Sequence, residues 1–584
     1  NLFELRAYAG GYHFYSDAAE DNVTGVKGRL ELRVNDVIAS IPGSRLTVDY
    51  EVSHDDVRDT RHDVGLRMRI PLSGGKPVQA LASLSHQQRR MLDGIERDTD
   101  IVTGRSKREN VEDALTGTDF DRVAYADATT DVSTTSTTAG DKSLIILNGT
   151  VTGSQEVQAN QTLQGGGSTI EIRGRRTGLV VPFTAPGAAG SLEVPGDDTQ
   201  NLLINGSNIH VSGITIDGNY DSVTDANQDS NGIFIGSGRQ NVFLTNLTIV
   251  NAGDNSVYIG DGNQVTINNL KSKGSGGSSI AINDINQVTI EGGYIEKSNG
   301  HGITIDEGNT VTMTNLNINV IYSHRTLYAI FMNEGNHVEF SNLKITGPAN
   351  DSGNAFVPAI AIGANANNIL SGSGLDIEEA GIQGIELRRN GNTLSLTDAR
   401  FADLAYSGIT VLGDSNTVSV DGGIFRGIDS DVLYVAGSSN IVSFTASTVS
   451  GAVYGIYIDG HENDVTISDS RFSEISADVF RIDYDDSNVL SVSSSIFNSV
   501  DGNVFRFSDT DASQVLISNN IFNGPIGGNL FVFENSGSTV LQAGSTGNTN
   551  NTGVAPTCEQ TGTAGFTGEI SFTDSTSVNA ATCP

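Results

Sequence analysis

Long apolar segments are missing from this sequence. No apolar run reaches the ~18 residues that a transmembrane helix needs, so we predict no such helix. Tryptophan is absent, proline occurs only 11 times in 584 residues, and stretches rich in Ala, Glu, Lys and Leu are few. Gly, Asn, Ser and Thr are abundant instead. This balance favours short strands joined by many turns over long helices.

Positive charge is scarce and unevenly placed. The chain has 34 Lys and Arg against 69 Asp and Glu. Residues 1–110 hold 16 basic and 17 acidic residues. Residues 111–584 therefore hold 34 − 16 = 18 basic and 69 − 17 = 52 acidic residues. We expect the acidic second part to repel nucleic acid and anionic membrane surfaces. We predict no cofactor beyond weak binding of a divalent cation such as calcium.

Cysteine occurs only twice, at Cys558 and Cys583. A pair that closes one loop near a terminus predicts a disulfide, and therefore an oxidising compartment; two free thiols are the alternative. The chain begins at Asn1 with no Met and no visible signal peptide, so we expect a processed or incomplete chain that lacks upstream sequence.

Residues 1–75 contain four segments in which apolar and polar residues alternate: 2–15, 28–36, 45–54 and 62–72. Period two predicts long antiparallel strands. One face would be apolar and the other would carry charges of both signs. This describes either an ordinary soluble sheet or the end of a transmembrane β-barrel with a charged lumen. The barrel reading requires further strands upstream, because the smallest barrels have about eight.

The next segments change character. Residues 76–104 have a helical apolar period, with Arg89, Arg90, Glu96 and Arg97 on the polar side. We predict a linker helix over 76–110, which either stays exposed or pairs its arginines with strand carboxylates inside a barrel. Residues 111–143 are expected to form an N-terminal cap, with a Ser/Thr-rich loop at 127–141.

Three of these stretches, "GSRLTVDYEVSHDDVR", "VGLRMRIPL" and "RRMLDGIERDTDIVT", resemble the C-terminal end of the inverse autotransporter barrel, the intimin/invasin type of outer-membrane domain. The resemblance covers residues 1–104. It implies a barrel in the bacterial outer membrane whose pore holds the linker. It also implies a C-terminal passenger displayed on the cell surface.

Residues 144–545 carry a repeat. An Asn followed two and four positions later by apolar residues returns every 23 to 32 residues. The members are Asn263, Asn286, Asn309, Asn336, Asn368, Asn392, Asn416, Asn440, Asn463 and Asn488. A second apolar column follows nine positions after the Asn and is broken only at Ser272. A third piece reads Gly-Ile-x-Ile, as in "NGIFI" and "YGIYI".

Three short strands in a unit of about 23 residues cannot bury an apolar face alone, so stacked coils are expected. The pattern resembles the right-handed parallel β-helix of pectate lyases and many surface proteins. We predict that the Asn residues adopt a left-handed turn conformation and form a hydrogen-bonded ladder, a structural role weighed against ligand binding. Residues 144–174 are similar to the start of β-helical passengers on inverse autotransporters. Residues 546–584 would form a disulfide-closed C-terminal cap.

Two places on this helix raise the possibility of chemistry. "NGHGITI" contains the Gly-His-Gly of polygalacturonases at His301, and Asp254 lies two coils earlier. Inverting hydrolysis needs two carboxylates ~6.5–9.5 Å apart, yet no paired Asp-Asp and no Arg-x-Lys motif accompany His301. Arg481 in "RIDYDDS" stands near Asp483 and Asp485, which form a candidate calcium site.

We therefore predict an all-β surface protein of the bacterial outer membrane, whose passenger serves adhesion, surface contact or glycan binding. The alternative is a polysaccharide lyase or hydrolase that acts on acidic glycans. Self-association through exposed strand edges is a third possibility. Function is expected where the repeat is broken, at residues 320–328 and 347–358.

Overall fold

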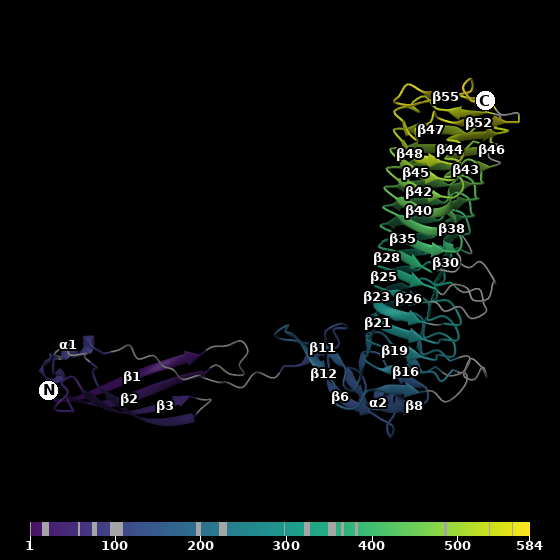
Figure 1. Ribbon diagram of the computed structural model, residues 1–584. Helices are drawn as coiled ribbons and strands as arrows, with labels where there is room; N and C mark the ends of the chain where they lie inside the picture. The colour runs from purple at the N-terminus through teal and green to yellow at the C-terminus, as the bar shows by residue number, and fades with distance from the viewer. Residues whose placement is uncertain are drawn as a thin grey trace. The chain divides into compact units, whose positions relative to one another are not determined.

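A computed structural model describes most of the chain (Figure 1). The described residues are 2–14, 23–55, 59–72, 79–93, 109–193, 200–220, 230–296, 298–319, 328–347, 358–363, 367–379, 383–483, 487–536, 538–562 and 565–583. The chain divides into two compact units: residues 1–110 with 174–179, and residues 111–173 with 180–584. Among the described residues, no helix has the length and apolar character needed to cross a membrane.

The first unit is built on a four-stranded antiparallel sheet in the order β1-β2-β3-β4. Its strands are β1 (Phe3–Phe14), β2 (Val23–Asn35), β3 (Arg45–Asp55) and β4 (Asp59–Arg69). The four alternating segments are thus confirmed as strands, and each pairs with its neighbour in sequence.

Of the segment predicted as a helix over 76–110, the structure describes residues 79–93 and 109–110, and within these it places α-helix only at 86–91. A 3₁₀ turn, η1 (Leu81–Ser83), precedes the short helix α1 (His86–Met91), and residues 94–108 lie outside the described part. The helix begins late because the backbone N–H groups of Leu81 and Ala82 donate to the Asp36 carboxylate. Ser85 then caps α1 through a capping box with Gln88.

The second unit is a parallel β-helix, as the repeat predicted (Figure 1). Its 46-stranded sheet consists of three columns of strands. The first column contains β6 (Arg122–Ala126), β7 (Ser143–Leu147), β10 (Gln161–Gly165), β15 (Ile209–Ser212), β18 (Val242–Thr245), β21 (Gln264–Lys273), β23 (Gln287–Glu296), β25 (Thr310–Thr314), β28 (His337–Ser341), β31 (Ile369–Ser373), β34 (Thr393–Thr397), β37 (Thr417–Asp421), β39 (Ile441–Thr445), β41 (Asp464–Ser468), β44 (Val489–Ser493), β47 (Gln514–Ser518), β50 (Thr539–Leu541) and β53 (Phe566–Thr567).

The second column follows the first along each coil. It contains β8 (Thr150–Thr152), β13 (Ser191–Glu193), β16 (Thr215–Asp217), β19 (Thr248–Val250), the ends of β21 and β23, β26 (Asn317–Asn319), β29 (Lys344–Thr346), β32 (Asp376–Glu378), β35 (Arg400–Leu404), β38 (Ile424–Val435), β40 (Thr448–Ile458), β42 (Arg471–Ile475), β45 (Ile496–Val500), β48 (Ile521–Ile526) and β51 (Thr549–Asn551).

The third column completes each coil. It contains β9 (Gln155–Val157), β14 (Leu202–Ile204), β17 (Ile233–Ile235), β20 (Val257–Ile259), β22 (Ile280–Ile282), β24 (Ile303–Ile305), β27 (Ile330–Met332), β30 (Pro358–Ile362), β33 (Gln383–Leu387), β36 (Ile409–Val411), the ends of β38 and β40, β43 (Phe480–Asp483), β46 (Phe505–Ser508), β49 (Phe531–Glu534) and β52 (Cys558–Thr561). Because successive side chains point to opposite faces, the first and third residues of most of these triplets are buried and the middle one faces outward.

The interior is one continuous apolar cluster from Ala126 to Cys583. The second column confirms the predicted run of core residues, with Phe401 stacked on Phe425 at 4.7 Å between ring centroids. Its exception is also explained. Ser272 is buried, and its hydroxyl lies 2.7 Å from that of Ser256, so the buried polar group is satisfied.

The Asn ladder is confirmed, and it stands at the turn between the third and first columns. Each ladder Asn from Asn263 to Asn463 donates its backbone N–H to the side-chain oxygen of the next ladder Asn. All ten ladder residues are buried. Asn440, for example, receives the N–H of Asn416 at 2.7 Å.

The predicted backbone conformation of these residues is wrong. The left-handed position belongs to the residue immediately before each ladder Asn, such as Gly262, Ile285 and Ser439 (φ 68°, 58° and 58°). The Asn itself is selected for its amide, because a buried backbone N–H on the neighbouring coil needs an acceptor.

The N-terminal cap also differs from the expected loop at 127–141. Residues 132–139 form helix α2 (Val132–Ala139), which Asp131 caps by accepting the N–H of Thr134. Ser136 on α2 is buried and bonded to Gln161 of the first full coils, so tertiary contacts override the low helix propensity of Ser and Thr. A three-stranded sheet of β5 (Val111–Asp113), β11 (Thr169–Gly174) and β12 (Val180–Thr184) packs on β7, where Ile170 and Phe183 share an apolar cluster with Leu144 and Ile146.

The C-terminal cap contains the predicted disulfide. Cys558 and Cys583 are bonded, with 5.1 Å between their Cα atoms. The small sheet of β54 (Glu569–Ser571) and β55 (Ser577–Asn579) precedes the second cysteine.

Candidate functional site

The outer face of the third column carries aromatic and charged side chains in one line. In-register pairing stacks the middle residues of consecutive strands on top of one another. In order they are Phe234, Tyr258, Ala281, Thr304, Phe331, Ala361, Glu386, Thr410, Tyr434, Tyr457, Arg481 and Arg506. We call this line the outer strip. All of its aromatic residues remain partly exposed.

The sequence contained a signal for this strip. Its members occupy the variable position x of the Gly-Ile-x-Ile piece, in which the flanking residues fill the core. Phe234 in "NGIFI" and Tyr457 in "YGIYI" are examples. In the sequence this piece marks the repeat, and which residue types gather at x becomes visible only when the coils are stacked.

His301 lies at the edge of the strip, just before β24, in an aromatic cluster. Its ring stacks on those of Tyr328 and Phe331, with centroid distances of 4.9 and 5.2 Å. The guanidinium of Arg388 lies over the Tyr328 ring at 4.9 Å and pairs with Glu386 at 3.1 Å. Residues 320–327, which precede Tyr328, lie outside the described residues, as do residues 348–357 of the second predicted insertion.

The protonation of His301 follows from its contacts. The backbone N–H of Tyr328 donates to Nδ1 of His301 at 3.0 Å, so a neutral ring carries its proton on Nε2. Burial, and after it the charge of Arg388, lowers the pKa of His301 to about 4. At neutral pH the one free lone pair of the ring, on Nδ1, is therefore occupied by the Tyr328 N–H, and Nε2 offers a hydrogen-bond donor rather than a general base.

Asp254 lies two coils before His301, at the start of the coil that contains β20. One coil adds about 4.8 Å along the axis, so the two residues stand roughly 10 Å apart in that direction. The position beside Asp254 is an amide: Asn255 Nδ2 donates to Asp254 at 2.7 Å and to Asn231 at 3.0 Å. In the described part of the chain, no carboxylate is hydrogen-bonded to His301.

A second aromatic cluster lies further along the outer strip. The rings of Tyr434 and Tyr457 are 5.2 Å apart, and Tyr454 lies 6.4 Å from Tyr457. Arg481 sits over Tyr457 at 5.0 Å. Burial, and after it the negative charge of Asp483, raises the pKa of Tyr457, so this phenol stays protonated and donates to Asp483 at 3.2 Å.

The candidate cation site is only partly described, because Asp485 lies outside the described residues. Asp483 is buried, and its Oδ2 accepts hydrogen bonds from Arg481 Nε at 2.6 Å and from Tyr457. Within the described ranges there is no group of three or more His, Cys, Asp or Glu residues that could hold a metal ion. Asp483 is thus placed as the partner of an arginine and a tyrosine.

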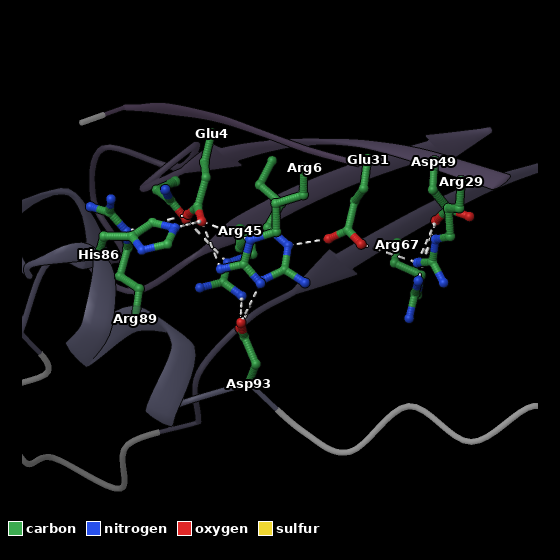
Figure 2. Close-up of polar contacts among 12 residues, drawn as sticks. Glu4, Arg6, Arg29, Glu31, Arg45, Asp49, Arg67, His86, Arg89 and Asp93 are labelled. Carbon is green, nitrogen blue, oxygen red and sulfur yellow. Dashed lines mark hydrogen bonds and ion pairs between the residues drawn. The ribbon is translucent and has the colours of Figure 1, made fainter. Parts of the chain in front are cut away.

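The first unit has its own charged cluster, drawn in Figure 2. The Asp93 carboxylate accepts hydrogen bonds from Arg6, Arg33 and Arg45 at 2.6, 2.7 and 2.8 Å. Arg89 of α1 is buried and forms an ion pair with Glu4 of β1 at 3.3 Å. Arg89 thus pairs with a strand carboxylate, as one reading of the linker predicted, whereas Asp93 pairs with arginines of the strands.

The opposite face of this sheet is apolar and exposed. Its residues are Phe3, Leu5, Leu30, Leu32, Val48, Tyr50, Val64, Leu66 and Met68, each at least 38% exposed. Glu31, in contrast, is completely buried between the arginines. A soluble sheet has the reverse distribution, with apolar side chains inside and charges outside.

Comparisons with known proteins find similar structures but no family. No protein-family model and no curated protein matches the chain. The A-module of a mannuronan C-5 epimerase from Azotobacter vinelandii has 14% identity and a TM-score of 0.33, over 59% of this chain and 90% of that one. A family 28 exopolygalacturonase from Yersinia enterocolitica has 11% identity and a TM-score of 0.25, over 76% and 84%. Tailspike protein 3 of bacteriophage CBA120 has 11% and 0.28, over 76% and 65%.

Proposed function

We propose that the protein is a carbohydrate-binding protein displayed on the bacterial cell surface. The observation that carries the proposal is the outer strip, where partly exposed Phe and Tyr rings stand beside arginine and carboxylate groups. Sugar rings stack their apolar faces on aromatic side chains, while their hydroxyl groups need polar partners. Arg388 with Glu386 and Arg481 with Asp483 supply such groups next to the rings.

Binding is favoured over cleavage in this proposal because Asn255, an amide, is the residue that donates to Asp254, and because His301 presents a donor. A binding site needs oriented donors, acceptors and ring faces, and these are present. A lyase or hydrolase acting on acidic glycans is the competing function. It predicts release of reducing ends from polyuronides, with or without calcium.

The test uses the full chain, purified in detergent micelles, on an array of neutral and acidic glycans. We expect retention of at least one glycan class, and loss of that signal in the double variant Tyr434→Ala/Tyr457→Ala. Tyr294→Ala is the matched control, because Tyr294 is an exposed tyrosine of β23 on another face. No retention by the wild-type chain, or equal retention by the double variant and the control, would count against the proposal.

Attachment to the outer membrane is the second part of the proposal, and the inverted sheet of the first unit supports it. A strand that is apolar toward lipid and charged toward a lumen is typical of a transmembrane barrel. The described strands are 11 to 13 residues long, enough for a tilted span of about 9–11 residues. Further strands would have to close the barrel.

Flotation of the full chain with phospholipid vesicles tests the attachment. Leu66 on the exposed apolar face is 71% exposed, so we expect Leu66→Asp to reduce flotation strongly, because a carboxylate on the lipid side is costly. Arg61→Gln changes the other face of the same strand and should have little effect. A wild-type chain that does not float with the vesicles would refute the attachment.

A further inference from the structure

We propose that the ligand of the outer strip is a linear polysaccharide bound lengthwise, parallel to the axis of the β-helix, with contacts at three separate aromatic stations. This inference rests on the proposed glycan binding and goes beyond it, because it excludes recognition of a single terminal sugar. Strand register places one or two rings of each station in one line: Phe234, Tyr258, Phe331, Tyr434 and Tyr457.

The three stations are all members, or neighbours, of the same line of middle residues. The first is Phe234 with Tyr258, whose rings stack at 4.9 Å with an angle of 10° between their planes. The second is Phe331 with the stacked rings of His301 and Tyr328. The third consists of Tyr434, Tyr454 and Tyr457.

Small or polar side chains separate the stations. Ala281 and Thr304 lie between the first and the second, so Tyr258 and Phe331 are three coils apart. Ala361, Glu386 and Thr410 lie between the second and the third, so Phe331 and Tyr434 are four coils apart. At about 4.8 Å per coil these spacings are roughly 14 and 19 Å. A mono- or disaccharide can therefore touch only one station.

The intervening side chains of Ala281, Thr304, Ala361 and Thr410 are smaller than the rings of the stations. Ala361 is completely buried and Thr410 nearly so, which means that neighbouring side chains cover them and that a bound chain would contact the rings instead. The rise of one coil is close to the length of one sugar in an extended chain. Successive sugars of a linear polymer can thus lie in the same position against successive coils, whereas those of a compact or branched glycan cannot.

Polar groups beside the rings of the second and third stations can hydrogen-bond a polysaccharide that lies along the outer strip. Nε2 of His301 is a hydrogen-bond donor, and in the described part of the molecule no side chain or backbone group accepts from it. The Arg388 guanidinium stacks on Tyr328, and that of Arg481 on Tyr457, so each holds its position with its edge toward hydrogen-bond partners. Such donors suit the hydroxyl, ring and carboxylate oxygens of sugars.

Chain length is the experimental variable. Contact at a second station becomes intramolecular once a chain spans two stations, so affinity should rise in steps rather than smoothly. The probes are cello-oligosaccharides and alginate oligosaccharides of about 2, 4, 8 and 12 sugars, titrated calorimetrically into the full chain in detergent. We expect a first step near the length that spans ~14 Å and a second where all three stations are covered.

Three single variants locate the steps: Phe234→Ala, Phe331→Ala and Tyr457→Ala. Each should weaken binding of the longest chains by about 3- to 10-fold, as expected for loss of one aromatic contact of about 0.7–1.4 kcal/mol. Each should change binding of the two-sugar probes by less than about twofold, since two other stations remain. Tyr294→Ala should change neither, and thermal unfolding of every variant checks its fold.

The outcomes separate this inference from the proposed function. Lengthwise binding is overturned if all chain lengths bind equally tightly. It is also overturned if one variant abolishes binding of all lengths. Either outcome leaves glycan binding in place. Absence of binding for every length of both series overturns lengthwise binding, and absence of retention on the glycan array as well overturns the proposed function.

Discussion

The backbone N–H of Asn440 donates a 2.9 Å hydrogen bond to the side-chain oxygen of Asn463 on the next coil. The same relation recurs along the ladder, so each Asn satisfies a buried group of its neighbour. The ladder thereby links each coil to the next at the turn between the third and first columns.

Asn440→Ala should destabilise the β-helix by about 1–3 kcal/mol. The N–H of Asn416, which now donates to Asn440, would be left buried without an acceptor. Urea denaturation measures the loss, and hydrogen exchange should show it concentrated near this coil, because coils interact mainly with their neighbours. Ser443→Ala on the outer face of the same coil is the control and should cost little. An equal cost for the two variants would contradict a structural ladder.

Asp93→Asn should release residues 79–93 from the sheet of the first unit. The substitution removes the charge that pairs with Arg6, Arg33 and Arg45 and leaves three guanidinium groups close together. Loss of one partner from such a buried network costs about 3 kcal/mol or more. Protease cleavage or hydrogen exchange of α1 reports the release. The exposed Asp63→Asn on β4 should leave α1 protected; equal protection in both variants would argue against the anchoring role.

The same contact predicts an acid limit. Burial by itself raises the pKa of Asp93, but the hydrogen bonds from Arg45, Arg6 and Arg33 outweigh it and hold that pKa well below the ordinary 3.8. A depressed carboxylate pKa stabilises the fold above the ordinary value, and this stability is lost as pH falls through the folded-state pKa. Protection of α1 in wild type should therefore persist at pH 5 and decline only in stronger acid.

The buried His301 predicts that the stability of the β-helix falls in mild acid. Its folded-state pKa of about 4 lies below the ordinary 6.5, so between these values the unfolded chain binds a proton and the folded chain does not. Stability should fall as pH drops from about 6.5 to 4, by up to about 3 kcal/mol. Urea unfolding at pH 7.5 and 4.5 measures it. His301→Gln should reduce this dependence, whereas His337→Gln, which is exposed, should retain it.

Cys558→Ser/Cys583→Ser should loosen the C-terminal cap. The bond closes a loop with a sequence separation of 25, worth about 3 kcal/mol in the chain-entropy model. The loss should appear as earlier proteolysis after residue 545, with little change in exchange of the central coils. Unchanged protease resistance of the cap would show that its packing suffices without the disulfide.

Some features followed from single segments of sequence. Alternation in residues 1–75 identified four strands, because a period of two depends only on neighbouring residues. Within the helix predicted at 76–104, residues 79–85 are not α-helical, since Asp36, which is distant in sequence, holds the backbone before Ser85. The Ser/Thr-rich segment became α2 because it packs on the first coils, which local propensity does not contain.

The site was harder to find. Tyr434 and Tyr457 are 23 residues apart, and each looks like one more half-buried strand residue. Their rings meet only because the strands pair in register and side chains alternate between faces. His301 was noticed for a motif, yet its neighbours Phe331 and Arg388 come from later coils, and they make it a donor within an aromatic cluster.

The sequence by itself determined the parallel β-helix, its Asn ladder and its terminal disulfide, because a repeat states the same local preference many times and only one stacking satisfies all copies. Only the tertiary structure decided which face carries the aromatic line and which face of the first sheet is exposed. Those outcomes depend on which non-repeating residues become neighbours, and that relation exists only after the coils and strands have been assembled.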